Sequence, residues 1–144
     1  MASTFTYPID IETDEAGFVL VTFPDVPEAG TDGVSVDEAL AGASDSLIAA
    51  LGGYIQDHRP IPNPSPARGR NTVAPPPLIA AKLALYQSMV DHKLTRVALA
   101  EKLGLSEGAI RRLLDLDHRS HIAQVEAALA VLGKRLEVRV YDAA

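Results

Sequence analysis

The stretch that decides the fold covers residues 96–113 and reads RVALAEKLGLSEGAIRRL. It predicts two short helices joined by a tight turn, because Gly104 stands where the chain must reverse and glycine tolerates a positive φ. Ser106 follows the turn and can cap the second helix through its hydroxyl. This layout is typical of a helix-turn-helix motif that reads DNA.

Apolar residues recur in this stretch so that the two helices can pack against each other. Ala100 is small where the second helix must cross closely, and we expect Leu105 to be buried in the turn. The expected inner positions are Leu99, Ala100, Leu103, Leu105, Ile110 and Leu113.

The outward side of the motif carries the residues expected to contact DNA. In such motifs the second helix lies in the major groove with its early residues at base edges. Arg112 could form a bidentate contact with guanine, and Glu107 could accept a hydrogen bond from a cytosine amine. Arg96, Ser106 and Arg119 are better placed for phosphates. The predicted DNA-binding residues are Arg96, Ser106, Glu107, Gly108, Arg111, Arg112 and Arg119.

A plainer interpretation of the same stretch is a helical core whose polar face is only solvated. Glu107 and Asp115 favour this interpretation, because their negative charges would lie near the DNA phosphates and be repelled by them.

The distribution of charge along the chain favours DNA binding. The chain of 144 residues has a net charge of −6. Residues 1–62 hold 11 acidic residues and one basic residue, whereas residues 63–144 hold 8 acidic and 12 basic residues. This asymmetry predicts two modules with different partners, the basic one suited to phosphate.

The acidic half has an α+β pattern. Apolar and polar residues alternate over residues 5–12, and residues 18–23 form a stretch that is apolar on both faces, which together predict a β-hairpin. There is room for a third short strand near residues 28–32. A helix begins at Ser35, which forms a capping box with Glu38, and its apolar positions continue to about residue 58. We therefore expect a small antiparallel sheet with one main helix, spanning residues 1–62.

Seven prolines between residues 60 and 77 predict a semi-rigid linker over residues 63–77, with a short strand possible near residues 70–74. The remaining domain, residues 78–144, reads as all-α. We expect helices at 78–91, 97–103, 106–114 and 122–132, closed by Gly133.

The last segment, residues 136–141, alternates like a strand and needs a pairing partner for its backbone groups. Symmetric pairing with a second chain would supply one and create a dimer. The predicted dimerisation residues are Leu136, Val138 and Val140.

No catalytic or metal site is expected, and no cofactor. Cysteine is absent, which excludes disulfides and thiolate metal sites. His118 and His121 have no evident third ligand. The acidic residues of the first hairpin could be proposed as a nuclease set, but a solvated strand face and a turn explain them better. These residues are Asp10, Glu12, Asp14 and Glu15.

The sequence also gives no indication of export or membrane insertion. The N-terminus has neither a basic region nor an apolar block, so we expect no secretory signal. Lys82 interrupts the longest apolar stretch, which is too short to span a bilayer. We expect a cytoplasmic protein, associated with the nucleoid when bound to DNA.

Nearly the whole chain resembles the HicB antitoxins of bacterial toxin–antitoxin pairs. In the first half the resemblance rests on Tyr7-Pro8-Ile9, on FPDVP at residues 23–27 and on TDGVSVDEA at residues 31–39. In the second half it rests on AKLALY at residues 81–86, IRRLLD at residues 110–115 and AALAVLGKRL at residues 127–136. There are two departures. Many relatives carry Gly-Cys where this chain has Glu28-Ala29-Gly30, and Arg96 replaces the usual Gln.

The resemblance implies a non-catalytic N-terminal domain like a truncated ribonuclease H. It also implies a partner, a small basic RNA-cleaving toxin of the HicA type, which that domain covers and inhibits. The C-terminal domain would bind double-stranded operator DNA in the operon's own promoter, as a homodimer or tetramer. The alternative is a free-standing regulator whose N-terminal domain binds another ligand or only oligomerises; a nuclease is a more distant third.

Overall fold

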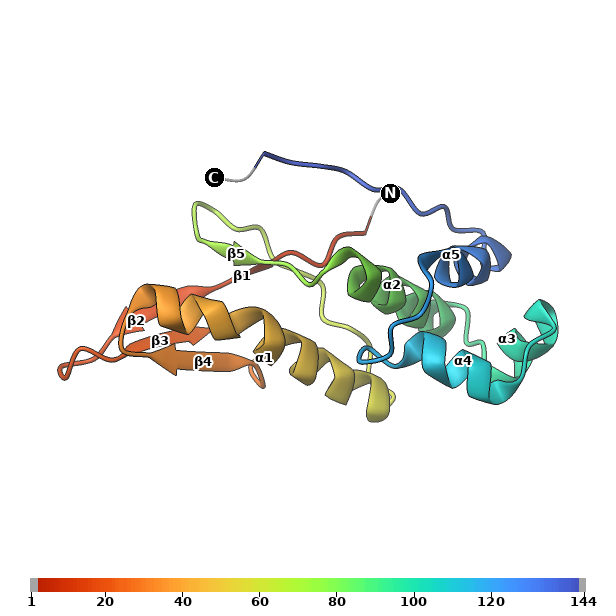
Figure 1. Cartoon of the computed structure of the whole chain (residues 1–144), viewed down its shortest axis with the longest axis horizontal. Coiled ribbons are helices and arrows are strands. Elements are labelled where there is room, and N and C mark those ends of the chain that lie inside the picture. Colours follow the sequence, from red (N-terminus) through yellow and green to blue (C-terminus); the bar gives the residue numbers. More distant parts are fainter. Residues whose placement is uncertain (1–2, 143–144) are drawn as a thin grey trace. The chain divides into compact units, whose positions relative to one another are not determined.

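The computed structural model describes residues 3–142, and the chain divides into two compact units with the boundary between Pro76 and Pro77 (Figure 1). Within the described residues, the first unit contains all the strands and one long helix, and the second unit is helical. The mixed α+β class expected from the sequence is therefore confirmed.

The main sheet of the first unit is antiparallel, with the strand order β2-β3-β4. Its strands are β2 (Asp10–Thr13), β3 (Val19–Thr22) and β4 (Gly30–Gly33). Opposite residues across the three strands include the row Glu12, Leu20 and Asp32. Side chains alternate between the two faces of such a sheet. Val19 and Val21 are accordingly buried, while Leu20 between them is exposed.

Helix α1 (Val36–Gln56) packs against β3 and β4 and covers one face of this sheet (Figure 1). Its apolar positions recur at helical spacing and are fully buried at Ala39, Ala43, Leu47 and Leu51. The Ser35 half of the expected capping box is confirmed, whereas the Glu38 carboxylate bonds the N–H of Val34 and not that of Ser35. The Ser35 Oγ accepts from the backbone N–H of Glu38 at 3.2 Å, and the Glu38 carboxylate accepts from the N–H of Val34 at 3.4 Å.

Two glycines allow α1 to lie unusually close to β4. A Cβ added at Gly33 would lie 2.9 Å from the backbone nitrogen of Ala39, and one added at Gly42 would lie 2.9 Å from the Thr31 Oγ1. Both distances are shorter than side-chain contacts allow. Close helix–strand packing in this unit therefore depends on the missing side chains.

The first expected strand is split. β1 (Tyr7–Pro8) pairs antiparallel with β5 (Thr72–Val73), whereas β2 begins at Asp10 in the other sheet. Hydrogen bonds also hold the proline-rich segment that we expected to be a linker. The Tyr7 hydroxyl donates to the carbonyl oxygen of Pro62 at 2.7 Å, and Ser65 donates to Asp25 through both N–H and Oγ. Residues 63–76 thus belong to the first unit.

The second unit contains four helices with boundaries close to those expected. Helix α2 packs against α5 and α4, and α3 packs against α4 and α5. The core is apolar and includes Leu83, Leu85, Val125 and Leu129. The helices are α2 (Pro77–Asp91), α3 (Arg96–Leu103), α4 (Glu107–Leu114) and α5 (Ile122–Val131).

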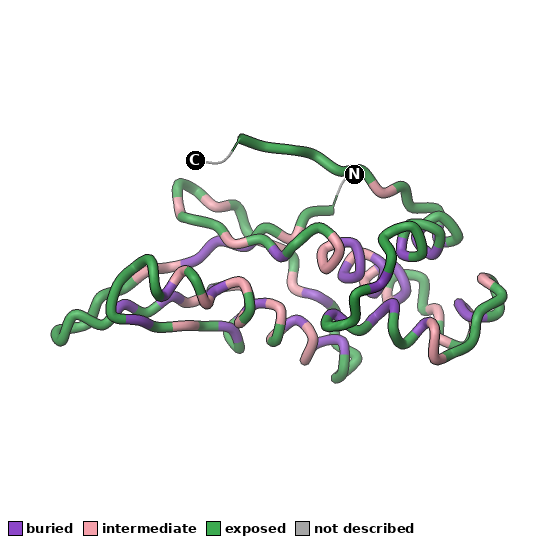
Figure 2. Tube along the Cα trace, viewed as in Figure 1, coloured by how far each residue is buried: buried purple, intermediate pink, exposed green. Residues whose placement is uncertain are grey.

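The C-terminal strand predicted over residues 136–141 is wrong for the single chain. Residues 134–142 are neither helix nor strand and are exposed along almost their whole length (Figure 2). Val138 keeps 64% of its surface exposed and Val140 keeps 92%. The alternating pattern does not form a strand here because no strand of the second unit's described residues is available to pair with it.

Candidate nucleic-acid interface

The turn between α3 and α4 is fixed by caps on both helices. Thr95 caps α3 through a 3.1 Å hydrogen bond from the N–H of Ala98 to its Oγ1, and α3 ends at Gly104, which has a φ of 67°. Ser106 caps α4 through a 3.1 Å bond from the N–H of Ala109 to its Oγ. The glycine turn and the serine cap predicted from the sequence are both confirmed.

The inner side of the helix pair is mostly as predicted. Leu99, Ala100, Ile110 and Leu113 are buried. The expected burial of Leu105 is wrong, because 44% of its surface is exposed. Its backbone closes the end of α3, because the Leu105 N–H donates to the carbonyl oxygen of Ala100 at 2.9 Å.

The predicted DNA-binding residues of α4 share one exposed side of the helix. Glu107 and Arg111 are four residues apart, as are Gly108 and Arg112, so each pair lies on the same face. A Cβ at Gly108 would lie 3.8 Å from Nη1 of Arg112. The Arg112 guanidinium therefore lies beside the first turn of α4, at a distance that would be an ordinary contact for a side chain at position 108.

The other three predicted contacts lie outside this helix. Ser106 is exposed at the N-terminus of α4, with its Oγ used as the cap. Arg96 is half-buried at the start of α3, and its charge partly offsets the burial that raises the pKa of Tyr86. Arg119 is exposed in the loop between α4 and α5. The structure thus gathers Glu107, Gly108, Arg111 and Arg112, with Arg96 and Arg119 on separate elements.

A residue that sequence reasoning did not assign to the interface holds α4 in place. Lys82 on α2 is fully buried. Its Nζ donates to three backbone carbonyl oxygens, those of Arg112 at 2.9 Å, Asp115 at 2.6 Å and His118 at 2.7 Å. One ammonium group therefore joins α2 to the last turn of α4 and to the loop that carries Arg119.

The chemistry of Lys82 suits this position. The C-terminus of a helix presents carbonyl groups without helical partners and carries partial negative charge, which a cation stabilises. Burial lowers the pKa of Lys82, and the nearby charges of Asp115 and Asp117 oppose that shift. In the sequence, the only signal was a lone lysine within the apolar stretch LIAAKLAL at residues 78–85.

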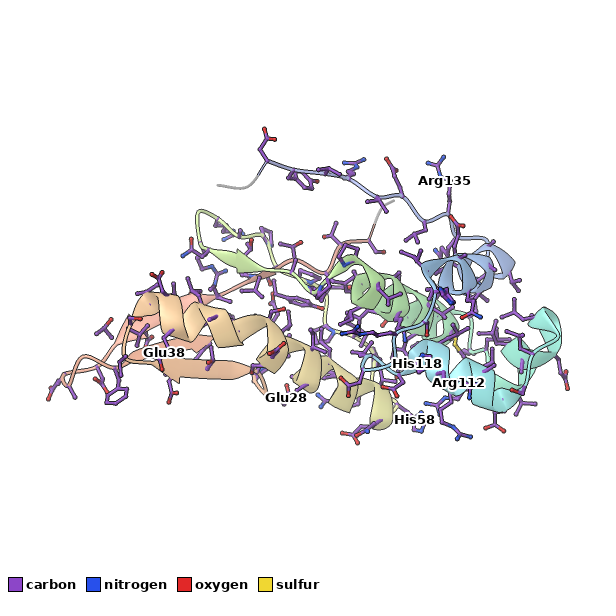
Figure 3. All side chains as sticks on the ribbon, in the orientation of Figure 1. Glu28, Glu38, His58, Arg112, His118 and Arg135 are labelled. Carbon is purple, nitrogen blue, oxygen red and sulfur yellow. The ribbon has the colours of Figure 1, made fainter. Side chains whose placement is uncertain are left out.

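His118 is part of the same loop and is engaged in it. Its Nδ1 lies 3.0 Å from the Ser120 Oγ, and that hydroxyl lies 3.4 Å from the Arg112 carbonyl oxygen, to which it donates (Figure 3). Across residues 3–142, no group of three or more His, Cys, Asp or Glu side chains is arranged to hold a metal ion. The contact with Ser120 makes His118 part of the hydrogen-bonded loop between α4 and α5.

Glu28, at the first departure from the family pattern, also has a structural role. Its carboxylate accepts from the Tyr54 hydroxyl at 2.7 Å and from the Arg59 guanidinium at 3.0 Å. These bonds, the Tyr54 bond first, lower the pKa of Glu28. Arg59 lies over the Tyr54 ring at 4.0 Å from its centroid. The three residues tie the segment before β4 to the end of α1.

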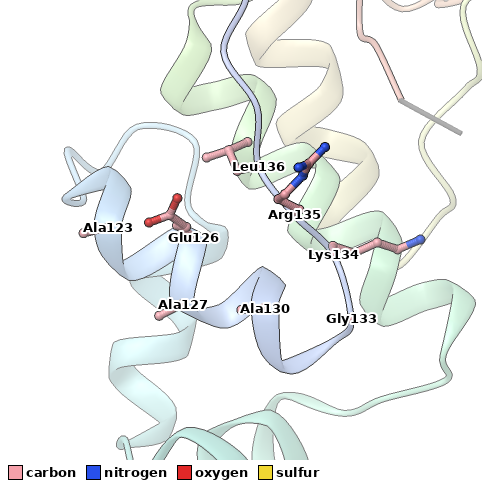
Figure 4. Close-up of a pocket in the computed structure, with 8 residues that line it drawn as sticks. All are labelled: Ala123, Glu126, Ala127, Ala130, Gly133, Lys134, Arg135 and Leu136. Atoms are coloured by element: carbon pink, nitrogen blue, oxygen red, sulfur yellow. The ribbon is translucent and has the colours of Figure 1, made fainter.

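An open pocket of about 500 Å³ separates α5 from the chain that follows it (Figure 4). Its helical wall is formed by the small side chains of Ala123, Ala127 and Ala130 together with Glu126, and its other wall is the chain from Gly133 to Leu136. Ile122 and Val131 on α5 are each 43% exposed. These two side chains do not line the pocket, whose α5 wall is formed mainly by alanines.

In the part of the chain that the structure describes, none of the helices has both the length and the apolar character needed to cross a membrane.

Comparison with known proteins adds to this geometry. Residues 6–84 match the family model described as a HicB-like antitoxin of bacterial toxin–antitoxin systems. The chain is 41% identical over 138 residues to Antitoxin HicB 2 of Photorhabdus laumondii, covering 96% of this chain and 98% of that protein. It is 35% identical to Antitoxin HicB of Escherichia coli K12 (92% and 96% covered) and 33% identical to Antitoxin HicB of Pseudomonas fluorescens (94% of each covered).

Proposed function

The chain belongs to the HicB-like antitoxin family, and on that basis we propose that its two units divide the work of an autoregulated antitoxin. The first unit neutralises a HicA-type RNA-cleaving toxin. The second unit binds promoter DNA through α3, the turn and α4, and represses the operon that encodes both proteins.

The observation that carries the DNA-binding part is the exposed side of α4. Two arginines project from a short helix whose N-terminus follows a tight turn and whose C-terminus is fixed by Lys82. Such a helix fits the major groove, and an arginine there can form two hydrogen bonds with one guanine. Charge supports the division: residues 1–76 hold 11 acidic and 3 basic residues, and residues 77–144 hold 8 acidic and 10 basic residues.

We propose further that two chains associate through α5 and the segment that follows it. The backbone groups of residues 136–141 have no strand partner within the described residues of the chain, and Val138 and Val140 are exposed. Antiparallel pairing of two such segments would satisfy the backbone groups of both chains. Leu136, Val138 and Val140 would line that contact in a homodimer or in a tetramer.

The second candidate is a free-standing transcriptional regulator without a toxin. The α4 surface supports both candidates equally, because it bears on DNA binding and not on toxin binding. The two differ in what the first unit binds. A neighbouring reading frame for a small basic protein that co-purifies with the chain supports the antitoxin, and the absence of such a frame contradicts it.

Replacing Arg112 with Ala in the full-length chain tests the proposal. We expect affinity for the chain's own promoter to fall by about 1–3 kcal/mol, while toxin neutralisation in cells is unchanged. Arg68→Ala is the matched control, because Arg68 is equally exposed but lies in the first unit. Promoter affinity measured by fluorescence anisotropy decides the result. Equal affinities for the two variants would contradict the role of Arg112 at a base edge.

A further inference from the structure

Among residues 3–142, the face of the β2–β3–β4 sheet that points away from α1 is largely exposed. Alternation places Asp10, Glu12, Leu20, Thr22 and Asp32 on this face. Leu20 is 45% exposed, and Phe18, directly before β3, is 51% exposed. Val34, directly after β4, is 69% exposed. Continuing the alternation by one residue puts Phe18 and Val34 on the same face as Leu20.

Carboxylates flank these apolar side chains on both edge strands. Glu12 on β2 and Asp32 on β4 lie directly across from Leu20. Asp14 closes the hairpin beside Phe18, with its carboxylate accepting from the Phe18 N–H at 2.9 Å. We call this surface the outer sheet face; it comprises Asp10, Glu12, Asp14, Phe18, Leu20, Asp32 and Val34.

Little within the chain neutralises this charge. Arg70 lies 3.5 Å from Asp10, and both side chains remain partly exposed. Between residues 3 and 142, no Lys or Arg lies within ion-pair distance of Glu12, Asp14 or Asp32. The outer sheet face is therefore an apolar strip bordered by carboxylates, of which Glu12, Asp14 and Asp32 have no ion-pair partner among residues 3–142.

The uncovered face of an antiparallel sheet is normally polar. Contiguous exposed apolar residues with a polar rim mark a protein-binding surface. We propose that the outer sheet face is the surface that binds the toxin, a basic protein that places apolar side chains over Phe18 and Leu20 and Lys or Arg side chains against Glu12 and Asp32. This inference rests on the proposed function.

Charge selects this occupant over two others. A second copy of the chain, docked face to face, would bring the same carboxylates against each other, and like charges across an interface cost several kcal/mol. Nucleic acid would be repelled by the same groups. A basic protein would be attracted by the carboxylates of the outer sheet face and could still pack its apolar side chains against Phe18 and Leu20.

Charge reversal at one position of the face, compared with the same change elsewhere, tests the inference. Glu12→Lys changes the outer sheet face, and Asp45→Lys makes the same change on the exposed side of α1. The binding of each full-length variant to a catalytically inactive form of the toxin encoded beside its gene would be measured by isothermal titration calorimetry. We expect Glu12→Lys to weaken binding at least tenfold and Asp45→Lys by less than about twofold. Higher salt should reduce the difference between them.

The outcomes separate this inference from the proposed function. If the unaltered chain binds the toxin and the two variants bind it equally well, the outer sheet face is not the toxin surface, but the antitoxin function stands. If the unaltered chain does not bind the toxin, the proposed function fails and the inference with it. Promoter affinity and circular dichroism of both variants should match the unaltered chain. If Glu12→Lys alone loses structure, Asp32→Lys replaces it in the experiment. The same loss of toxin affinity, at least tenfold, is expected for Asp32→Lys.

Discussion

The outer sheet face of the first unit and the exposed side of α4 in the second are held in place in different ways. The sheet face depends on close approach: α1 presses on β4 where Gly33 has no side chain, so strand and helix backbones almost touch. The α4 surface depends on a buried charge, because one ammonium group binds three carbonyl oxygens at the end of the helix. The first arrangement is sensitive to volume and the second to charge.

This difference has a consequence for the two surfaces. Carboxylates on a sheet keep the fixed spacing of the strand ladder, which suits a partner with a rigid surface. Arginines on a short helix have long flexible arms, and only the helix beneath them is fixed. A change of volume at Gly33 should therefore disturb toxin binding alone, and a loss of charge at Lys82 should disturb DNA binding alone.

The largest effect is expected from Lys82→Met, which keeps most of the volume and removes the charge. Three carbonyl oxygens would lose their shared donor, and we expect the free energy of unfolding of the second unit to fall by about 3 kcal/mol. Promoter affinity should fall with it, while toxin binding is retained. Urea unfolding followed by circular dichroism, with the exposed Lys134→Met as control, measures the change. Equal stability of the two variants would show that Lys82 does not anchor α4.

A smaller effect, on the first unit and not on the second, is expected from Gly33→Ala. Its Cβ would meet the backbone of α1, which cannot move aside as a flexible side chain can, so we expect a loss of about 2 kcal/mol in the stability of the first unit. Gly53→Ala is the control, because a Cβ there meets nothing within 4 Å. In mid-helix this second change should stabilise the protein by about 0.5–1 kcal/mol. Thermal unfolding measures the stability of both variants. If Gly33→Ala and Gly53→Ala change the stability in the same direction, the close-packing explanation is contradicted.

The smallest effect concerns the proline-rich segment. Tyr7→Phe removes the hydrogen bond to the Pro62 carbonyl oxygen and should cost about 1 kcal/mol of stability. It should also change the response to alkali. Burial, followed by the nearby charge of Asp25, raises the pKa of Tyr7 above its ordinary value of 10.0. The folded chain therefore holds this proton more tightly than the unfolded chain does. The resulting stability is present below pH 10 and is lost as the pH rises above it.

The matching measurement is unfolding at pH 8 and pH 11 for both chains. Tyr54 and Tyr86, whose pKa values are also raised, are common to both chains, so the difference between the chains isolates Tyr7. We expect Tyr7→Phe to lose less stability than the unaltered chain between these two pH values. An equal loss would mean that Tyr7 is not protonated more tightly in the folded protein.

Much of the fold followed from local sequence signals. The Ser35–Glu38 cap, the turn at Gly104 and the cap at Ser106 each depend on residues within a few positions, so the sequence was enough to locate them. The failures concern partners that are distant in sequence. The alternating segment that begins at Leu136 has no strand partner among the described residues, and the side chain of Leu105 stays 44% exposed.

The candidate site divides in the same way. The sequence by itself determined that Glu107, Gly108, Arg111 and Arg112 share one side of α4, because helical periodicity fixes which residues are neighbours on a helix. It also determined the separation of charge between the two halves of the chain. Only the tertiary structure decided that Lys82 holds the end of α4 and that Glu12 and Asp32 flank Leu20. Those arrangements join residues 30 to 36 positions apart at Lys82 and depend on strand register in the sheet. Such contacts form only when separate elements pack together, so a local sequence pattern does not predict them.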